Sequence, residues 1–291
     1  MRFSALVVLH DSEADLRRLL ASLERHLDPP PELVVVDSGS SDQGAALARE
    51  HGARVIELDV NAGFGAANNA GLAVCSEPVT VLLNPDCVAL DAGLTALARL
   101  AAAGDAILAP RLLDDDGSVQ RSAHPLPGTA AGLLAAVVPP RALPRPLREF
   151  LEPYRADAPR RVGWAVAACL AARTDLLRRL GPFDPAAFLF YEDLDLCLRA
   201  RAAGVPVQLR PEIALGHRGG HSTGPAFGGE AFELQARRRR EVIRHQLGAR
   251  ALALDDAAQG LTFALRSVAH RGAERRRNVA ALRALRSVRR G

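Results

Sequence analysis

Several features that would quickly assign a function are scarce in this 291-residue sequence. It contains no lysine, so its basic residues are all arginine, and aromatic residues make up only 4% of it. In an alanine- and arginine-rich background of this kind, a single arginine is weak evidence of a binding surface. The four cysteines, Cys75, Cys87, Cys169 and Cys197, form no C-x-x-C pair, so neither a zinc knuckle nor a disulfide framework is indicated. A reduced, cytosolic compartment therefore fits best.

Long apolar runs are also absent. The two longest candidates, at 130–138 and 162–172, are well short of the roughly 18 residues that a membrane-spanning helix needs. The chain enters an apolar run at residue 3 without a basic leader or a small-residue cleavage site, so we expect no signal peptide. There is no internal repeat. Together these absences favour a globular protein of the cytoplasm.

Charge is distributed unevenly along the chain. Residues 231–291 carry 15 arginines and 5 acidic residues, a net charge of +10, whereas residues 1–230 carry 22 arginines and 28 acidic residues, a net charge of −6. The arginine runs at 237–240 and 275–277 could form a solvated helical face, a surface that binds nucleic acid or a surface that binds anionic lipid. The alanine and leucine spacing favours an amphipathic helix on the inner face of the membrane, and we expect no nucleic-acid partner.

The first part of the chain predicts an α/β fold. Short apolar runs alternate there with helical patterns, which is typical of a mainly parallel sheet. The expected strands are 3–9, 33–37, 54–58 and 79–83, and the expected helices are 12–27, 42–51 and 66–74.

The remainder is predicted to be less regular. Residues 125–159 contain eight prolines, so they should form an irregular connection, either a flap or an insertion. Beyond it we expect a strand or buried segment at 164–173, helices at 174–180 and 192–203, and a mostly helical tail. We divide the chain into a main domain, 1–225, and a basic, mainly helical extension, 226–291.

Polar residues follow three of the predicted strands. They form the clusters 37–42 (DSGSSD), 61–71 (NAGFGAANNAG) and 84–86 (NPD). Ligands of parallel sheets bind beyond the carboxyl ends of the strands, so these clusters should converge on one cleft.

Each cluster has a functional and a structural interpretation. Asp37, at a strand end, can accept a hydrogen bond from a nucleobase or ribose, or it can close a turn, while Asp42 would cap the next helix. Gly63 and Gly65 stand on either side of Phe64. They would let backbone approach an anionic ligand at a helix N-terminus, or they form a tight turn.

Two further sites have the residue types of metal ligands. Asp86 follows a proline that fixes the backbone, and its carboxylate can anchor Mg²⁺ or Mn²⁺ or belong to an ordinary turn. His217 and His221 lie in a glycine-rich loop, where a histidine is either a ligand or a surface residue.

The segment 188–204 (FLFYEDLDLCLRARAAG) places three acids beside extensive apolar surface. Buried carboxylates need partners or a function. The helical period puts Glu192 and Asp195 on one side and Asp193 on the other. All three also suit the positive end of a helix dipole, so only one needs to be a catalyst.

Taken in order, these motifs resemble the family 2 glycosyltransferases, in particular their bacterial rhamnosyltransferase-like branch. The resemblance runs from residue 3 to about residue 223. It rests on VVVDSGSSD, NAGFGAANNAG, LLNPD, GSVQRSAHP, GWAVAACLAAR, LGPFDPAAFLFYEDLDLCLRARAAG and HRGGHS. None of these is specific alone, but the ordered set is.

The resemblance implies a GT-A fold and a sugar transfer with inversion at the anomeric carbon. The favoured donor is dTDP-L-rhamnose, and the acceptor is a glycan or polyprenyl-linked sugar in cell-wall or surface polysaccharide synthesis. Asp193 would be the general base, with Glu192 positioning it, while Asp86 and His217 would hold a divalent cation, Mg²⁺ or Mn²⁺, on the donor diphosphate. The residues implied on the donor side are Asp37, Ser38, Asn61, Gly63, Phe64, Gly65, Asn68, Asn84 and Asp86, and those on the acceptor side are Trp164, Ala167 and Ala168.

Some positions depart from the family pattern. His10 and Asp11 stand where an aromatic residue and asparagine are usual, Asn84 stands in place of an acid in the metal motif, and Ala167 replaces a glycine. If these changes disable the site, the chain would be an adaptor of GT-A fold that binds a nucleotide-sugar or glycan without turnover. A nucleotidyltransferase is disfavoured, because residues 9–15 lack the glycine-rich basic loop of that class. The sequence leaves the oligomeric state open.

Overall fold

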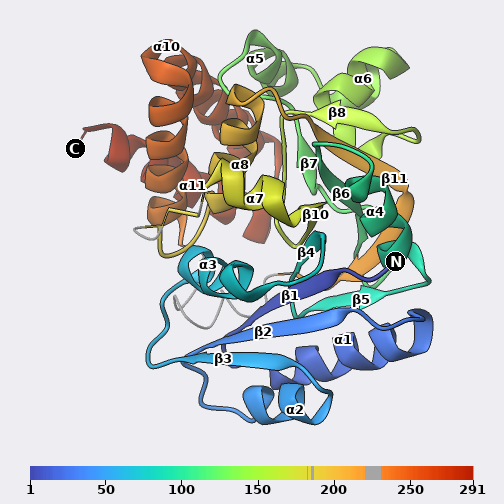
Figure 1. Ribbon diagram of the computed structural model, residues 1–291. Coiled ribbons are helices and arrows are strands. Elements are labelled where there is room, and N and C mark those ends of the chain that lie inside the picture. Colours follow the sequence, from blue (N-terminus) through green and yellow to red (C-terminus); the bar gives the residue numbers. More distant parts are fainter. Residues whose placement is uncertain (182, 185–186, 220–230, 291) are drawn as a thin grey trace.

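The computed structural model describes residues 1–181, 183–184, 187–219 and 231–290. Its centre is a nine-stranded sheet in the order β3-β2-β1-β4-β10-β6-β11-β5, with β8 paired to β11 outside this path (Figure 1). The strands are β1 (Ser4–Leu9), β2 (Glu32–Ser38), β3 (Arg54–Leu58), β4 (Val79–Leu83), β5 (Cys87–Ala89), β6 (Ile107–Leu113), β8 (Arg160–Val162), β10 (Cys169–Arg173) and β11 (Val207–His217). A separate two-stranded ribbon pairs β7 (Ala123–His124) with β9 (Trp164–Ala165).

The sheet is mainly parallel, as predicted. Strands β3, β2, β1 and β4 run parallel to one another, and so do β6 and β11. Strand β10 lies between β4 and β6 and is antiparallel to both. The strand expected at 164–173 is in fact two, because β9 ends at Ala165 and β10 begins only at Cys169.

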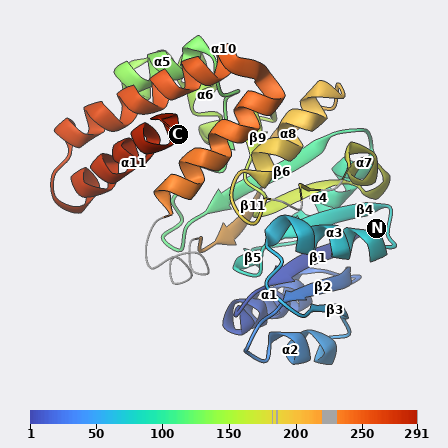
Figure 2. The ribbon, with the colours of Figure 1, turned by 90° about the vertical axis from the view of Figure 1, so that its left-hand side faces the viewer.

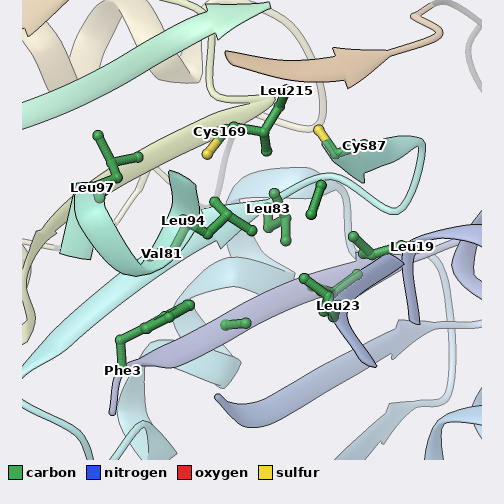
Figure 3. Close-up of a cluster of buried hydrophobic side chains, with 14 of the residues drawn as sticks. Phe3, Leu19, Leu23, Val81, Leu83, Cys87, Leu94, Leu97, Cys169 and Leu215 are labelled. Carbon is green, nitrogen blue, oxygen red and sulfur yellow. The ribbon is translucent and has the colours of Figure 1, made fainter. Parts of the chain in front are cut away.

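Helices cover both faces of the sheet. One face carries α1 (Glu13–His26), α2 (Gly44–Glu50) and α4 (Gly93–Ala102), and the other carries α3 (Phe64–Val74), α7 (Thr174–Leu180) and α8 (Glu192–Ala202). Strand β4 is buried on both sides, since Val81 and Leu83 face the first layer while Leu82 faces the second. Figure 3 shows the first of these two cores. Burial on both faces explains why the strands appear in the sequence as continuous apolar runs.

The proline-rich connection at 125–159 is more regular than the sequence indicated. It contains α5 (Ala130–Val137), α6 (Arg145–Leu151) and the short 3₁₀ turns η1 (Pro140–Ala142) and η2 (Pro153–Arg155). Five of the eight prolines lie at the starts of these short helices, where a missing N–H costs nothing. The connection therefore forms short helices, one of which, α5, packs on the C-terminal helix α10.

The tail is helical, as predicted. It consists of α10 (Phe232–Ala269) and α11 (Gly272–Arg290), and α10 bends sharply at Gly248, where φ is +85° (Figure 2). The apolar side of α11 packs inward and buries Ala281, Ala284 and Leu285. Its alanine and leucine spacing therefore serves internal packing. Among the described residues, no helix combines the length and the apolarity needed to cross a membrane.

Most of the arginine run at 237–240 forms internal ion pairs. Arg239 makes a bidentate pair with Asp255, at 2.8 and 2.7 Å, and the two side chains are only 14% and 6% exposed. Arg240 pairs with Asp256 across the same bend. Arg238 is also largely buried and contacts Glu241. The interpretation of this run as a solvated, nucleic-acid or lipid-binding face is therefore wrong for these three arginines.

Candidate functional site

A cleft of about 320 Å³ lies at the carboxyl ends of the parallel strands. It is lined by Val8, His10, Ser12, Asp15, Ser38, Asn61, Gly63, Phe64, Asn84, Pro85, Asp86, Phe188 and Leu189. Each of the three polar clusters of the sequence contributes to this lining, through Ser38, through Asn61 with Gly63 and Phe64, and through Asn84 with Asp86. The prediction that they converge on one cleft is confirmed.

The turn before α3 is tied to β2 by hydrogen bonds. Ser38 Oγ accepts the N–H of Ala62 at 3.0 Å, and Asn61 Oδ1 accepts the N–H of Gly63 at 3.0 Å. Gly63 has a φ of +83°, and a β-carbon on it would lie 2.2 Å from the carbonyl oxygen of Phe188. The N–H of Phe64 donates to that same carbonyl at 3.2 Å. This glycine is therefore needed for both the turn and its contact with the 188–191 segment.

Three predicted donor-side residues do not line the cleft. Asp37 is 5% exposed, and its Oδ1 accepts the N–H of Ser40 at 2.9 Å, which is the turn-closing arrangement. Gly65 packs against Phe183, and Asn68 donates within its own helix to the carbonyl of Phe64. These three residues therefore hold the local structure around the cleft and do not line it.

Asp42 accepts hydrogen bonds from the first residues of two helices. Its Oδ1 accepts the N–H of Gly44, the first residue of α2, at 3.0 Å, and its Oδ2 accepts the N–H of Glu13, the first residue of α1, at 2.7 Å. The predicted capping role is confirmed and extends to a second helix.

Asp86 and His217 meet at one wall of the cleft. His217 Nε2 lies 3.4 Å from Asp86 Oδ1, and both side chains are largely buried, at 11% and 13% exposed. Asp86 Oδ2 accepts the N–H of Gly219 at 3.0 Å. Burial works to raise the pKa of Asp86, but the bonds from His217 and Gly219 outweigh it and hold that pKa below its ordinary value. The second histidine of this motif, His221, lies outside the described residues.

Gln120 fixes the orientation of His217. Its Nε2 donates to Asp114 Oδ1 and to the carbonyl of His217, both at 2.6 Å, so its Oε1 is left as an acceptor for His217 Nδ1 at 2.7 Å. His217 therefore carries a proton on Nδ1, and Nε2 is the ring nitrogen that faces Asp86. Sequence reasoning did not single out Gln120. Its only signal was its place in the motif GSVQRSAHP.

This arrangement fits a hard divalent cation. A histidine ligand in proteins commonly donates its other ring N–H to a neighbouring acceptor, as His217 does to Gln120. Cys87 also lies near, but its thiol is fully buried, donates to the carbonyl of Ala168, and has a pKa raised well above the ordinary value by burial. The available donors are thus one carboxylate oxygen and one imidazole nitrogen, which suit Mg²⁺ or Mn²⁺ with further oxygen ligands from a diphosphate.

The three acids at the start of α8 have separate environments. Asp195 pairs with Arg199 at 2.8 Å and accepts from Gln246 at 2.7 Å, so it is structural. Asp193 Oδ2 accepts the N–H of Ala167 at 3.3 Å, and its Oδ1 accepts the N–H of Leu194 at 2.7 Å. Glu192 is 9% exposed, and its Oε2 has no hydrogen-bond partner among the described residues.

These environments decide which acid holds a proton. Burial raises the pKa of Glu192 to about 8, with a further contribution from the charge of Asp193, and burial raises the pKa of Asp193 to about 6. The two backbone N–H bonds to Asp193 favour its ionised form, whereas the unpartnered Glu192 is best accommodated as a neutral acid. Near neutral pH, Asp193 is therefore the carboxylate that can accept a proton.

The backbone of the residues between β9 and β10 links Asp193 to the cleft. Ala167 donates to Asp193, and the carbonyl of the next residue, Ala168, accepts the N–H of Asn84 at 2.8 Å. Trp164, Ala167 and Ala168 are all buried. Ala167 and Ala168 thus contribute only their peptide groups. Of the three predicted acceptor-side residues, Trp164 lines a cavity, which is separate from this cleft.

The segment leading into α8 was not recognised from the sequence as part of the cleft wall. Phe188 and Leu189 line the cleft, and the next two residues, Phe190 and Tyr191, have φ angles of +75° and +64°. Left-handed backbone at two successive bulky residues is strained and tends to occur where function requires it. His10, which replaces the usual aromatic residue, lies in the same cleft, and its Nδ1 contacts the carbonyl of Ser38 at 3.0 Å.

Comparison with known proteins identifies the family. The family described as "Glycosyl transferase family 2" matches residues 4–156, more than half of the chain. The chain belongs to this family. It is similar to the N-acetylglucosaminyl-diphospho-decaprenol L-rhamnosyltransferase of Mycobacterium tuberculosis (strain CDC 1551 / Oshkosh), with 32% identity over 241 residues that cover 75% of this chain and 76% of that protein. This family 2 protein is therefore a glycosyltransferase, as its motifs predict.

Solved structures share its fold. S. aureus TarS 1-349 superposes with a TM-score of 0.56 at 16% identity and covers 100% of this chain and 92% of that one. The mannosyltransferase PcManGT from Pyrobaculum calidifontis, in complex with GDP-Man and Mn²⁺, has a TM-score of 0.55 at 17% identity and covers 99% of this chain and 81% of that one. The predicted GT-A fold is confirmed.

Proposed function

We propose that this family 2 glycosyltransferase transfers L-rhamnose from dTDP-L-rhamnose, with inversion, to a sugar carried on a polyprenyl diphosphate. The observation that carries the proposal is the link between Asp193 and the cleft. Two consecutive residues, Ala167 and Ala168, bond on one side to this ionised carboxylate and on the other to Asn84, beside Asp86. A base is thereby held next to the wall that would receive a donor diphosphate.

Asp193 would act as the general base. A sugar hydroxyl is a weak nucleophile near neutral pH, so a carboxylate within hydrogen-bond reach must take its proton as the oxygen attacks the anomeric carbon. The attack comes from the side opposite the leaving nucleoside diphosphate, which gives inversion and needs no covalent enzyme intermediate. Glu192, as a neutral acid beside Asp193, would keep a second negative charge away from the reacting oxygen.

The donor would occupy the 320 Å³ cleft. Ser38 and Asn61 line it from the β2 side, and the N-terminus of α3 lies beside it, so the positive end of the helix dipole favours an anion there. Asp86 and His217 would hold Mg²⁺ or Mn²⁺, which when bound neutralises charge that grows on the departing diphosphate. The Nδ1 proton held by Gln120 keeps His217 Nε2 available for that role.

The choice of rhamnose and of a lipid-linked acceptor rests on the relative from Mycobacterium tuberculosis. Its name gives L-rhamnose as the transferred sugar and N-acetylglucosaminyl-diphospho-decaprenol as the acceptor. The 32% identity spans three quarters of both chains.

We propose in addition that the protein meets its acceptor at the inner face of the membrane. Internal packing occupies the apolar side of α11, so a lipid contact would come from other side chains. Val137, Phe150 and Val268, on α5, α6 and the end of α10, are 59%, 54% and 85% exposed. Helix α5 contacts both of the other helices. Exposed apolar side chains near basic residues are typical of peripheral membrane proteins.

A donor and transfer assay tests the function. We expect dTDP-L-rhamnose with Mn²⁺ to raise the melting temperature more than UDP- or GDP-sugars. Mass spectrometry should then show the gain of one deoxyhexose on an N-acetylglucosaminyl-diphospho-polyprenol. Binding of dTDP-L-rhamnose without transfer to this or any other acceptor would instead support the adaptor role. Transfer only from a UDP- or GDP-sugar would overturn the donor assignment.

Flotation with anionic vesicles tests the membrane contact. The double substitution Val137→Glu with Phe150→Glu should abolish co-flotation, because it places charges where the apolar contact is proposed. Leu100→Glu, on α4 at a side chain 37% exposed, is the matched control and should leave flotation unchanged. Unchanged flotation of the double variant would refute this surface.

A further inference from the structure

A second cavity, of about 300 Å³, lies between the β7–β9 ribbon, α5 and α10. Figure 2 shows α5 lying alongside α10, away from the central sheet. Tyr191 and Trp164 line this cavity, whereas Phe188 and Leu189 line the donor cleft. The strained segment 188–191 therefore lines both spaces. Its first two residues line the donor cleft, and its last residue lines the second cavity. Glu192 and Asp193 follow directly.

The walls of the second cavity are aromatic on the side of the acids. The His124 ring stacks on Trp164 with centroids 4.1 Å apart and planes at 14°, and the Tyr191 ring lies 6.2 Å from Trp164. Flat, buried aromatic faces of this kind suit the C–H faces of a sugar ring.

The opposite side of the cavity is positively charged. Arg121 lines it and lies over the ring of Tyr154 at 5.8 Å. Arg266 lies on α10 one turn beyond Thr262, another lining residue. Partial burial and then the charge of Arg121 lower the pKa of Arg266, so the two guanidinium groups lie within electrostatic range of each other. Neither forms an ion pair with any residue that the structure describes.

The acids close to these two arginines are already paired. Asp255 is held by Arg239 in the bidentate pair, and Glu152 accepts from Tyr154 at 2.9 Å and from Arg155 at 3.0 Å. Glu274, whose charge also acts on Arg266, pairs with His270. Inside the cavity, His124 is kept neutral, since burial and then the charges of Arg121 and Arg239 lower its pKa to about 3. The cavity therefore has a positive end at Arg121 and Arg266, two arginines without an ion-pair partner among the described residues.

We propose that this cavity binds the acceptor, with its sugar beside the rings of Trp164 and Tyr191 and its diphosphate at Arg121 and Arg266. The inference rests on the proposed function, because it takes the acceptor to be a glycosyl polyprenyl diphosphate. Guanidinium groups bind phosphate oxygens in bidentate fashion, and two adjacent arginines with no acidic partner match the two phosphates. The polyprenyl chain then leaves the cavity beside α5, toward the exposed side chain of Val137.

The single tryptophan of the chain makes the site directly measurable. Trp164 lines the cavity, so its fluorescence should change when farnesyl diphosphate is added, and this titration needs neither donor nor catalysis. In the double variant Arg121→Gln with Arg266→Gln the dissociation constant should rise at least 10-fold, as expected for the loss of charged hydrogen bonds. The variant Arg121→Lys with Arg266→Lys should recover part of this affinity. Arg286→Gln, at an exposed arginine of α11, is the matched control and should titrate like the wild type.

The outcomes separate this site from the proposed function. In transfer assays the double glutamine variant should show a raised acceptor KM with an unchanged donor KM. If it binds farnesyl diphosphate as tightly as the wild type while the wild type transfers rhamnose, the site is refuted and the function stands. If the wild type binds farnesyl diphosphate through these arginines yet transfers no sugar, the function fails and the site stands. A Trp164 response to phosphatidylglycerol vesicles but not to farnesyl diphosphate would also overturn the site, because it would indicate recognition of lipid headgroups.

Discussion

The backbone N–H of Ala167 donates to Asp193 Oδ2 across 3.3 Å, between two segments 26 residues apart. This bond has a chemical consequence, because an acceptor bond to a backbone N–H stabilises the carboxylate form. Asp193 therefore stays ionised beside Glu192, which remains protonated near neutral pH. Two neighbouring acids are thereby given different roles by their hydrogen bonds.

The first prediction concerns stability and pH. The pKa of Glu192 is raised on folding, so the folded protein binds more protons than the unfolded chain between about pH 4.3, the ordinary glutamate value, and about pH 8. The free energy of unfolding should therefore fall as pH rises through this range, by up to about 1.4 kcal/mol for each pH unit from this group. Glu192→Gln removes this contribution. Urea unfolding at pH 5 and pH 8 should show a smaller loss for Glu192→Gln than for the wild type, and equal losses would refute the assignment.

The second prediction concerns Gly63. Gly63→Ala should lower the melting temperature and weaken donor binding, because its β-carbon would collide with the carbonyl of Phe188 at 2.2 Å. Gly52→Ala is the matched control. Its φ of +73° is equally unfavourable for alanine, but no atom lies within 4 Å of the added carbon, so it should cost only about 1–2 kcal/mol of backbone strain. Equal effects of the two substitutions would show that the contact with Phe188 is unimportant.

The third prediction concerns Gln120. Gln120→Ala frees the His217 ring, so the affinity for Mn²⁺ in the presence of dTDP should fall about 10- to 100-fold, as is usual when such a supporting hydrogen bond is removed. Calorimetric titration with Mn²⁺ measures this without turnover. Ser118→Ala is the control, because Ser118 also bonds to Asp114, at 3.1 Å, but does not touch His217. If the Gln120→Ala protein bound Mn²⁺ as tightly as the wild type, His217 could not be a metal ligand whose orientation depends on Gln120.

The fourth prediction concerns the buried pair that holds the bend of α10. Asp255→Asn leaves the charge of Arg239 buried without a counter-ion, which should reduce the free energy of unfolding by about 3–5 kcal/mol. Arg17→Gln removes an exposed pair with Glu13, in which Arg17 is 62% exposed, and should cost less than about 1 kcal/mol. Urea denaturation compares the two. A cost for Asp255→Asn no larger than that for Arg17→Gln would mean that the pair does not stabilise the C-terminal helices.

Much of the fold could be predicted, because each strand and helix of its parallel half has a recognisable pattern in the local sequence. Strands such as Val79–Leu83 are buried on both faces and appear as continuous apolar runs, and helices lie between them at regular intervals. The direction of β10 was not predictable. An apolar run such as Cys169–Arg173 has the same pattern in either direction, and its antiparallel place between β4 and β6 is fixed by long-range pairing.

The site could be predicted where polar residues follow the ends of strands. It was harder to predict where the interacting residues are far apart in the sequence. Asp86 and His217 do meet as the motifs imply, whereas Asp37 is taken up by its own turn. Gln120 reaches His217 across 97 positions of sequence, and nothing local marks it as a partner. The arginine run at 237–240 was misinterpreted for the same reason, since its acidic partners lie beyond the bend at Gly248.

The most direct test of the account is rhamnose transfer by the Asp193→Asn protein. Asparagine keeps the size of the side chain but cannot accept the proton of an acceptor hydroxyl, so the rate of transfer from dTDP-L-rhamnose should fall at least about 100-fold. The affinities for donor and for farnesyl diphosphate should stay within a few fold of the wild type, because neither depends on a base. A rate equal to that of the wild type, with both ligands still bound, would contradict the assignment of Asp193 as the general base.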